Sequence, residues 1–197
     1  MPTRRAAQAP RPPSLPGDAG AEELRAGAMV AEVRLAEADL SGAVLDGLAL
    51  SDAELTGCNL ANVRGREAEL TRVALRGSRL TGLALPGASL RDVTVSGCRV
   101  DLASFGAARL QRVTFEDCLL ARTDFLEAVL ESVRFHDCDL TEADFRGARL
   151  QRCELRRCTL TGLEGVAGLR GAALEWPAIV EHAGLWAAAL GLAVLDD

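Results

Sequence analysis

Apolar residues recur with a period of five along most of the chain. From Leu35 to Leu160, 25 of the 26 residues whose numbers are multiples of five are Leu, Phe or Val, and Gly65 is the exception. The residue two places earlier is small or apolar in every repeat, whereas the other three positions are mostly polar, charged or Gly. This spacing fits neither the 3.6-residue period of a helix nor the strict alternation of a strand. It predicts a chain that turns every five residues and points two side chains of each repeat inward.

Glycine marks the predicted turns. Nine of the 26 positions that lie two residues after a multiple of five are glycines: Gly42, Gly47, Gly57, Gly77, Gly82, Gly87, Gly97, Gly147 and Gly162. The third residue of a type II turn has a positive φ, which glycine adopts at no steric cost. The repeat therefore predicts a polygonal coil with a corner every five residues.

A second period of twenty predicts four sides. Two inward columns show it: Val33, Ala53, Val73, Val93, Val113, Val133 and Cys153; and Ala38, Cys58, Ser78, Cys98, Cys118, Cys138 and Cys158. Each column is homogeneous and differs from the other, as stacking of like residues between coils would produce. Twenty-six repeats make about six to seven coils, roughly 31 Å long at ~4.8 Å per stacked strand. The register does not slip between residues 33 and 160, so we expect no projecting loop.

The pattern resembles the pentapeptide-repeat family, whose loose motif is A-[D/N]-L-x-x. The repeats that match best are Ala38-Asp39-Leu40, Cys58-Asn59-Leu60, Cys138-Asp139-Leu140 and Ala143-Asp144-Phe145. The resemblance implies an all-β fold, a right-handed quadrilateral parallel β-helix. The chain is also similar to the loopless quinolone-resistance branch of that family. That branch binds the type II topoisomerase DNA gyrase as a dimeric mimic of duplex DNA, and dimerises through its C-terminal end.

The sequence divides into four parts. Residues 1–20 contain five of the seven prolines and are expected to form a disordered tail. Residues 21–32 are expected to cap the solenoid, and residues 33–174 to form it. After residue 165 the apolar pairs come one residue early, which predicts a shift of register in the last coil. Residues 175–197 are expected to form a capping helix and a tail.

The C-terminal part predicts a homodimer. Pro177 suits the first turn of a helix, and a helically spaced apolar stripe follows to cover the open end of the last coil. The stripe consists of Ile179, Val180, Ala183, Trp186 and Leu190. The remaining large apolar residues are the candidate dimer interface: Leu185, Leu192, Val194 and Leu195. The alternative is that the tail folds back over its own last coil.

Composition excludes several classes of function. All 22 basic residues are Arg, and the net charge is −6. This negative charge argues against a nucleic-acid binder held by phosphate contacts. No run of 18 apolar residues is present, so no membrane span is expected. Arg4 and Arg5 are not followed by the apolar stretch of a secretory signal, and we therefore expect a cytoplasmic protein.

No catalytic or metal-binding motif is recognisable. All six cysteines occupy inward positions, and five share one column. A stacked thiol ladder could bind metal or form disulfides, but no C-x-x-C or nearby His pair accompanies it, so small buried hydrophobes are the preferred interpretation. His136 and His182 lack an adjacent nucleophile or orienting group. We expect no catalytic residue, no metal and no cofactor, and a protein that is not an enzyme.

Acidic residues concentrate between residues 116 and 144. The nine candidate partner-binding residues are Glu116, Asp117, Asp124, Glu127, Glu131, Asp137, Asp139, Glu142 and Asp144. With Arg122 and Arg134 they give this segment a net charge of −7. The segment is either an ordinary solvated surface with charges paired between coils or an acidic belt that docks on a basic protein.

Two functions are therefore compared. A general protein-interaction module ranks first, because a solenoid exposes long repetitive faces and the role needs no special charge pattern. Gyrase binding by DNA mimicry ranks second. Residues 33–162 hold 19 acidic residues against 17 Arg, a net charge of −2, whereas duplex DNA of the same length carries about 18 negative charges.

Overall fold

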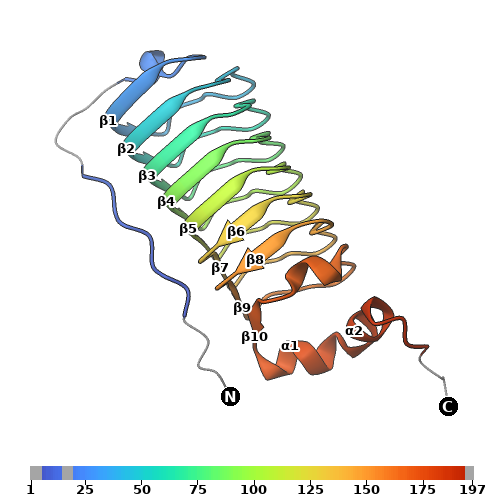
Figure 1. Ribbon diagram of the computed structural model, residues 1–197. Coiled ribbons are helices and arrows are strands. Elements are labelled where there is room, and N and C mark those ends of the chain that lie inside the picture. The colour runs from blue at the N-terminus through green and yellow to red at the C-terminus, as the bar shows by residue number, and fades with distance from the viewer. Residues whose placement is uncertain (1–5, 15–19, 194–197) are drawn as a thin grey trace.

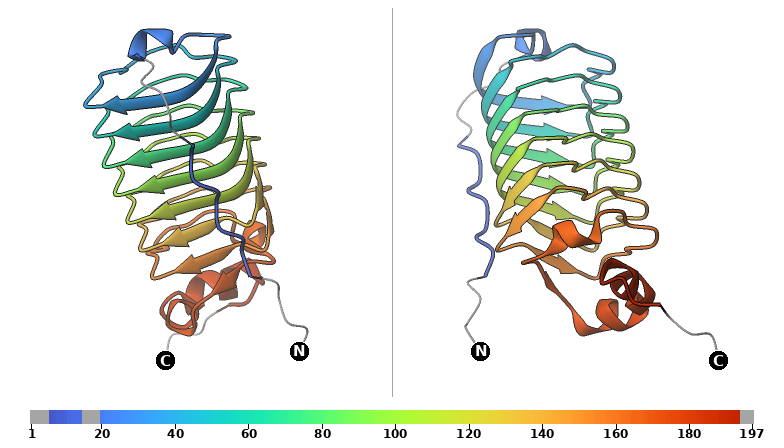
Figure 2. Two further views of the ribbon diagram at one scale, coloured as in Figure 1. Left: turned by 90° about the vertical axis from the view of Figure 1, so that its left-hand side faces the viewer. Right: turned by 45° about the vertical axis from the view of Figure 1, so that its right-hand side comes forward.

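The computed structural model describes residues 6–14 and 20–193. Within them the chain winds into a right-handed parallel β-solenoid of about seven turns, followed by a short helical region. Figures 1 and 2 show a straight shaft with stacked coils and no projecting loop between β1 and β9. The predicted fold class is confirmed.

Two adjacent sides of the shaft carry the strands, which belong to one ten-stranded sheet. The strands are β1 (Met29–Ala36), β2 (Ala49–Thr56), β3 (Glu69–Arg76), β4 (Ser89–Ser96), β5 (Arg109–Glu116), β6 (Val129–Glu131), β7 (Arg134–His136), β8 (Arg149–Gln151), β9 (Glu154–Arg156) and β10 (Ala173–Leu174). From β1 to β9 the strands pair in parallel at a spacing of twenty residues, for example Val33 with Ala53. The other two sides are joined by single bridges with the same spacing, for example Asp39 with Asn59. The twenty-residue period is therefore one coil.

The corners have the backbone conformation that the repeat predicts. All 26 residues two places after a multiple of five, from Glu37 to Gly162, have a positive φ. At two of the four corners a backbone hydrogen bond closes the turn, as from the Ala43 N–H to the Leu40 carbonyl at 3.0 Å. The remaining 17 of the 26 corners carry a side chain in the left-handed region, where only glycine is free of strain. Stacking of each coil on its neighbours holds them there.

Four faces and four corners can now be defined. The outward residues of face 1 are Arg34 and every twentieth residue after it; those of face 2 begin at Asp39, of face 3 at Val44 and of face 4 at Ala49. Successive faces meet at the left-handed corner residues. The strands β1 to β5 include the corner between faces 4 and 1, so this corner bends the strand without ending it.

The interior differs between the two halves of the shaft. The C-terminal half is filled by five phenylalanines in two columns, Phe105, Phe125 and Phe145 in one and Phe115 and Phe135 in the other. The N-terminal half contains Leu and Val layers and an apolar cavity of about 60 Å³, which borders Leu24, Gly65 and Phe115. The missing side chain at Gly65 and the absence of rings before residue 105 account for this void.

The two ends of the solenoid are closed differently. At the N-terminal end, η1 (Ala21–Glu23) precedes the buried Leu24, and β1 begins within the segment expected to be a cap. At the C-terminal end, η2 (Val166–Leu169) leads to β10, whose Ala173 pairs with Glu154, nineteen residues earlier. The predicted one-residue shift of register is confirmed.

The predicted single C-terminal helix is two helices, α1 (Trp176–Glu181) and α2 (Ala183–Ala189). The chain bends at His182, whose φ of −106° and ψ of 29° are not helical. The bend brings Leu185 and Trp186 against the core and lets the Trp186 indole N–H donate to the Ile179 carbonyl at 3.1 Å. The expected apolar stripe is consequently wrong, because Val180 and Leu190 are 58% and 75% exposed. None of the helices in the described part of the chain has the length and apolarity to cross a membrane.

Part of the predicted disordered tail is placed on the shaft. Residues 6–14 run in extended form beside the coils, from the level of β9 toward that of β2 (Figures 1 and 2). Their contacts are described below. Residues 1–5 and 15–19 of the predicted tail lie outside the described residues.

Candidate partner-binding surface

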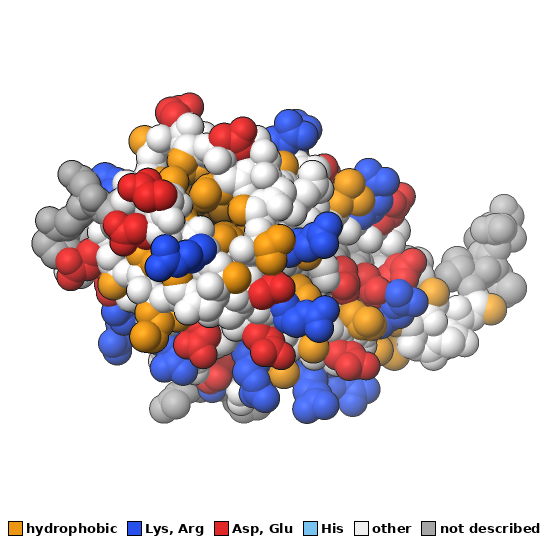
Figure 3. All heavy atoms as spheres, turned by 90° about the horizontal axis from the view of Figure 1, so that it is seen from above, with side chains coloured by type: hydrophobic (Ala, Val, Ile, Leu, Met, Phe, Trp, Pro, Cys, Tyr) orange, Lys and Arg blue, Asp and Glu red, His pale blue; other side chains and the backbone are white. Residues whose placement is uncertain are grey.

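The nine candidate acidic residues are distributed around the whole circumference of the shaft. Asp139 lies on face 2, and Asp124 and Asp144 lie on face 3, where they are direct bridge partners. Glu127 and Glu142 are exposed at the two corners that flank face 3. Viewed from the N-terminal end, acidic and basic side chains are interspersed rather than segregated (Figure 3). The acidic segment of the sequence therefore does not form one continuous acidic face.

Three of the nine acidic residues gather at one place, the acidic corner formed by Glu116, Asp117 and Asp137. It lies between faces 1 and 2, where Asp117 and Asp137 occupy successive coils. All three are exposed. A surface hollow of about 640 Å³ borders all three and continues past Gly77 and Gly97, where the corner carries no side chain. The geometry leaves room for a partner side chain to approach these carboxylates.

Three arginines that follow residue 144 neutralise part of the acidic segment. Arg157 contacts both Asp137 oxygens at 2.6 and 2.7 Å, and Arg146 pairs with Asp144 at 2.6 Å. Arg152 pairs with Glu131. These three arginines lie outside residues 116–144, so including them reduces the net charge of the segment from −7 to −4. The hydrogen bonds from arginine hold the pKa values of Asp137 and Asp144 below their usual range.

Asp124 and Asp139 are engaged in local hydrogen bonds. Asp124 accepts from the Ser104 hydroxyl at 2.9 Å and from the Leu126 N–H at 2.7 Å. Asp139 accepts from the N–H and the hydroxyl of Thr141 at 2.9 and 2.6 Å. These carboxylates shape the turns of the shaft and are half-buried, so they are less available to a partner than Glu116 and Asp117.

An acid–arginine ladder was missed in the sequence interpretation. Asp52 pairs with Arg72 and Asp92 with Arg112, each through two hydrogen bonds of 2.5 to 2.7 Å. Both pairs lie on the corner between faces 4 and 1, and in both the arginine follows the acid by twenty residues, one coil. The signal was present in the sequence as opposite charges at the twenty-residue period.

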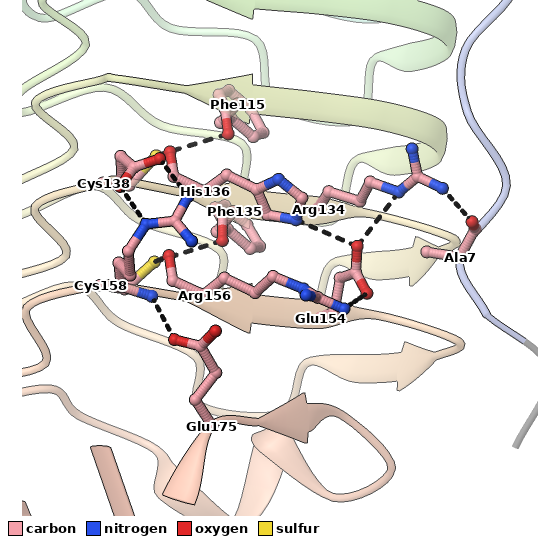
Figure 4. Close-up of polar contacts among 12 residues, drawn as sticks. Ala7, Phe115, Arg134, Phe135, His136, Cys138, Glu154, Arg156, Cys158 and Glu175 are labelled. Carbon is pink, nitrogen blue, oxygen red and sulfur yellow. Dashed lines mark hydrogen bonds and ion pairs between the residues drawn. The ribbon is translucent and has the colours of Figure 1, made fainter. Parts of the chain in front are cut away.

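A second polar cluster surrounds Glu154 at the C-terminal end of face 1 (Figure 4). Its Oε1 lies 3.0 Å from His136 Nε2 and 3.3 Å from Arg134 Nε, and its Oε2 lies 3.4 Å from Arg156. Arg134 also donates to the carbonyl of Ala7 (Figure 4). The partner of His136 is therefore a carboxylate within an ion-pair cluster on the surface of the shaft.

The cysteine thiols point into the shaft. Five are buried and Cys158 is half-buried, and all six are free. The Cys118 thiol donates toward the carbonyls of Val95 and Glu116 at 3.4 and 3.2 Å, and the other thiols contact equivalent carbonyls. Burial raises the pKa of Cys98 and Cys153 to about 11, so these thiols are protonated at neutral pH. Among the described residues no three potential metal ligands lie together.

The candidate dimer residues lie in different environments. Leu185 is half-buried and packs against the core of its own chain, whereas Leu192 is 60% exposed. Val194 and Leu195 lie outside the described residues. Three further apolar side chains of the helical region are exposed: Trp176, Val180 and Leu190.

Two family models match the sequence. The model described as "Pentapeptide repeat region" matches residues 88–164, and the model described as "Pentapeptide repeats (8 copies)" matches residues 34–64 and 68–106. Together they cover nearly the whole regular shaft. No curated protein shows significant sequence similarity to this chain.

Several solved structures are similar to the chain. A trypsin-treated form of QnrB1, a plasmid-mediated fluoroquinolone resistance protein, is 18% identical with a TM-score of 0.47, covering 87% of this chain and 93% of that one. HetL, a pentapeptide repeat protein involved in heterocyst differentiation regulation in Nostoc sp. strain PCC 7120, is 20% identical with a TM-score of 0.25, covering 74% and 89%. A pentapeptide repeat protein from the Arabidopsis thaliana thylakoid lumen is 21% identical with a TM-score of 0.33, covering 68% and 76%. The descriptions of these proteins differ from one another.

Proposed function

Because the chain belongs to the pentapeptide-repeat family, we propose that it is a non-catalytic protein-interaction module of the cytoplasm. Its acidic corner binds a basic surface of a partner protein. The observation that carries this proposal is the exposure of Glu116, Asp117 and Asp137 beside a 640 Å³ hollow.

The chemistry of the acidic corner favours an arginine or lysine side chain as its ligand. Asp137 is already paired with Arg157, but Glu116 and Asp117 make no ion pair with any other described residue. A partner cation placed in the hollow would gain charge-assisted hydrogen bonds from two exposed carboxylates. Such contacts chiefly accelerate association and select a complementary partner.

We expect reversal of the two free charges to weaken the complex. A full-length Glu116→Arg/Asp117→Arg variant should bind the partner at least tenfold more weakly, because attraction becomes repulsion. The partner is first captured from a lysate of the native host, then purified, and binding is measured by calorimetry. Glu67→Arg/Glu69→Arg, which reverses two exposed acids elsewhere on the shaft, is the control and should bind normally. Equal loss in both variants, or none in either, contradicts the acidic corner as the binding site.

Gyrase binding is the second candidate, and one observation favours it. Asp124, Asp144 and Glu164 follow one another as bridge partners on face 3, which stacks three carboxylates along the shaft as a row of phosphates would stand along DNA. Arg146 contacts both Asp144 and Glu164, and its positive charge makes this row of carboxylates less similar to a row of DNA phosphates. This candidate would rank first if the wild type captured gyrase subunits and inhibited cognate supercoiling at micromolar concentration. Charge reversal at Asp124, Glu127 and Asp144 should then abolish both effects.

We also propose a homodimer through the C-terminal helical region. Trp176, Val180, Leu190 and Leu192 expose large apolar side chains near the last coil, where a two-fold contact would bury them. Leu185 stays part of the proposed interface only through its half-exposed surface.

Light scattering is expected to give a dimer mass for the wild type and a monomer mass for Val180→Glu/Leu190→Glu. Charged side chains at a two-fold contact would face each other and remain desolvated. Leu102→Glu, an exposed leucine on a shaft corner, is the matched control and should remain dimeric. Truncation after Leu174 is a poorer test, because it removes Leu185 and Trp186 from the core. A monomeric wild type at high micromolar concentration rules the dimer out.

A further inference from the structure

The N-terminal segment, residues 6–14, is buried against the shaft at every third residue. Ala7 is 6% exposed, and Pro10 and Pro13 are half-buried. The segment has the sequence A-A-Q-A-P-R-P-P-S, and its other six residues are exposed. Burial at every third residue is the pattern of a polyproline II helix, which has three residues per turn and no internal hydrogen bonds. One edge of that helix therefore faces the shaft.

The backbone of the segment is anchored at two equivalent places. The Arg11 N–H donates to Asp92 Oδ1 and the Ser14 N–H to Asp52 Oδ1, both at 3.1 Å. The two donors are three residues apart, and the two acceptors are forty residues apart, which is two coils. A third contact joins the Arg134 guanidinium to the Ala7 carbonyl (Figure 4).

These spacings agree because two independent repeats have nearly equal lengths. Three residues of polyproline II advance about 9.3 Å. Two coils of stacked strands advance about 9.6 Å. A polyproline II segment laid along the shaft therefore meets the same environment at every turn of its own helix. The match arises from backbone geometry and would extend along the whole corner.

The shaft is shaped to receive such a segment along the edge of face 1. The outward residues here are the small side chains Ala74, Thr94 and Thr114. Ala74 is 2% exposed although it points outward, whereas the outward Ala84 of face 3 is only half-buried. The segment runs along this side of the shaft (Figure 2).

The adjoining corner holds the two acceptors in place. Arg72 and Arg112 each bind their aspartate through two hydrogen bonds, which orients the carboxylates and holds the pKa values of Asp52 and Asp92 below their usual range. Asp92 is 3% exposed, whereas Glu32 of the same column, beyond the level of Ser14, is exposed. The acid–arginine ladder thus borders the strip of face 1 along which the segment runs.

We propose that this strip, formed by face 1 and the corner that carries Asp52 and Asp92, is a binding site for polyproline II segments, with residues 6–14 as its built-in ligand. The class of ligand is a proline-rich peptide with Pro or Ala at every third position and a non-proline residue directly after it, because the N–H of that next residue reaches the aspartate. Residues 10–11 and 13–14 satisfy this rule as Pro-Arg and Pro-Ser. The site is separate from the acidic corner and does not depend on the function proposed above.

The test uses a full-length chain whose own segment is displaced. In Pro10→Glu/Pro13→Glu, two inward-facing residues acquire charges opposite Asp92 and Asp52, which expels the segment by repulsion. A fluorescent peptide with the sequence of residues 6–14 should bind this variant saturably. Wild type should bind it at least tenfold more weakly, because its tethered segment competes at high effective concentration.

A matched peptide distinguishes the proposed ligand rule from nonspecific binding of proline-rich peptides. Replacing Arg11 and Ser14 of the peptide with Pro raises its proline content but removes both N–H donors, so binding should fall at least tenfold. Replacing the exposed Pro12 with Ala should change binding less than twofold. Equal binding of the Arg11→Pro/Ser14→Pro peptide, or no binding of the original peptide to a displaced variant with a wild-type circular dichroism spectrum, overturns the proposal.

Amide exchange in the wild-type chain provides a second readout that needs no variant to fold. The Arg11 and Ser14 amides should exchange at least tenfold more slowly than in the free peptide. The Ala9 amide, which belongs to the same segment but has a different place in the threefold pattern, serves as the internal comparison. Exchange of Arg11 and Ser14 at the rates of the free peptide would also overturn the proposal.

Discussion

Replacing Phe125 with Ala is expected to lower the free energy of unfolding by about 4 kcal/mol, the size typical of a buried phenylalanine truncated in a rigid core. Phe125 is 0% exposed and is central to the phenylalanine ladder. Its ring stacks on Phe105 and Phe145, with centroids 5.4 and 4.9 Å apart. It also meets Phe115 and Phe135 edge to face. The void would be hard to close, because stacked coils hold the neighbouring rings at fixed heights.

Chemical denaturation followed by circular dichroism measures this loss. Leu126→Ala, at the adjacent corner, is the matched control, since its side chain is 40% exposed and should contribute less than about 1 kcal/mol. Phe125→Leu should fall between the two, because it retains most of the apolar volume. A loss below about 2 kcal/mol for Phe125→Ala would show that the coils relax into the void and that the ladder is not rigid.

Replacing Gly65 with Leu is expected to raise the free energy of unfolding by about 1 kcal/mol. Gly65 borders the 60 Å³ apolar cavity, and filling such a volume is worth roughly 1.4 kcal/mol at about 24 cal/mol per Å³. Its φ is not in the left-handed region, so a side chain brings no backbone strain. A Cβ there would come within 2.8 Å of Leu85 Cδ2, the flexible end of a side chain that borders the same cavity.

Thermal and chemical denaturation of two further variants test the argument for Gly65. Gly65→Ala should give a smaller gain, because one methyl group fills less of the cavity. Gly77→Ala, at a corner with φ of +53° and open space around it, should lose about 1 kcal/mol through backbone strain alone. A lower melting temperature for Gly65→Leu would mean that Leu85 cannot move aside.

The regular features of the shaft were determined by the sequence alone. The periods of five and twenty predicted the inward pairs, the four sides, the left-handed corners and the inward cysteines. They also predicted the one-residue shift of register seen between Glu154 and Ala173. The physical reason is that each coil contacts only its neighbours, so a short repeated pattern specifies the whole ladder. The acid–arginine pairs, such as Asp92 with Arg112, follow the same twenty-residue spacing and could have been predicted with it.

Other features depend on groups that only the folded shaft brings together. The nine acidic residues are close together in sequence, but winding separates them over several faces and places Arg152 and Arg157 of the next coil beside Glu131 and Asp137. The break at His182 depends on how α2 meets the last coil. The segment that looked disordered finds its binding site in residues 52 to 134, up to 127 positions away, as in the contact between Arg134 and Ala7. A proline-rich sequence has no core of its own, and its place is decided by a surface that exists only after the coils have stacked.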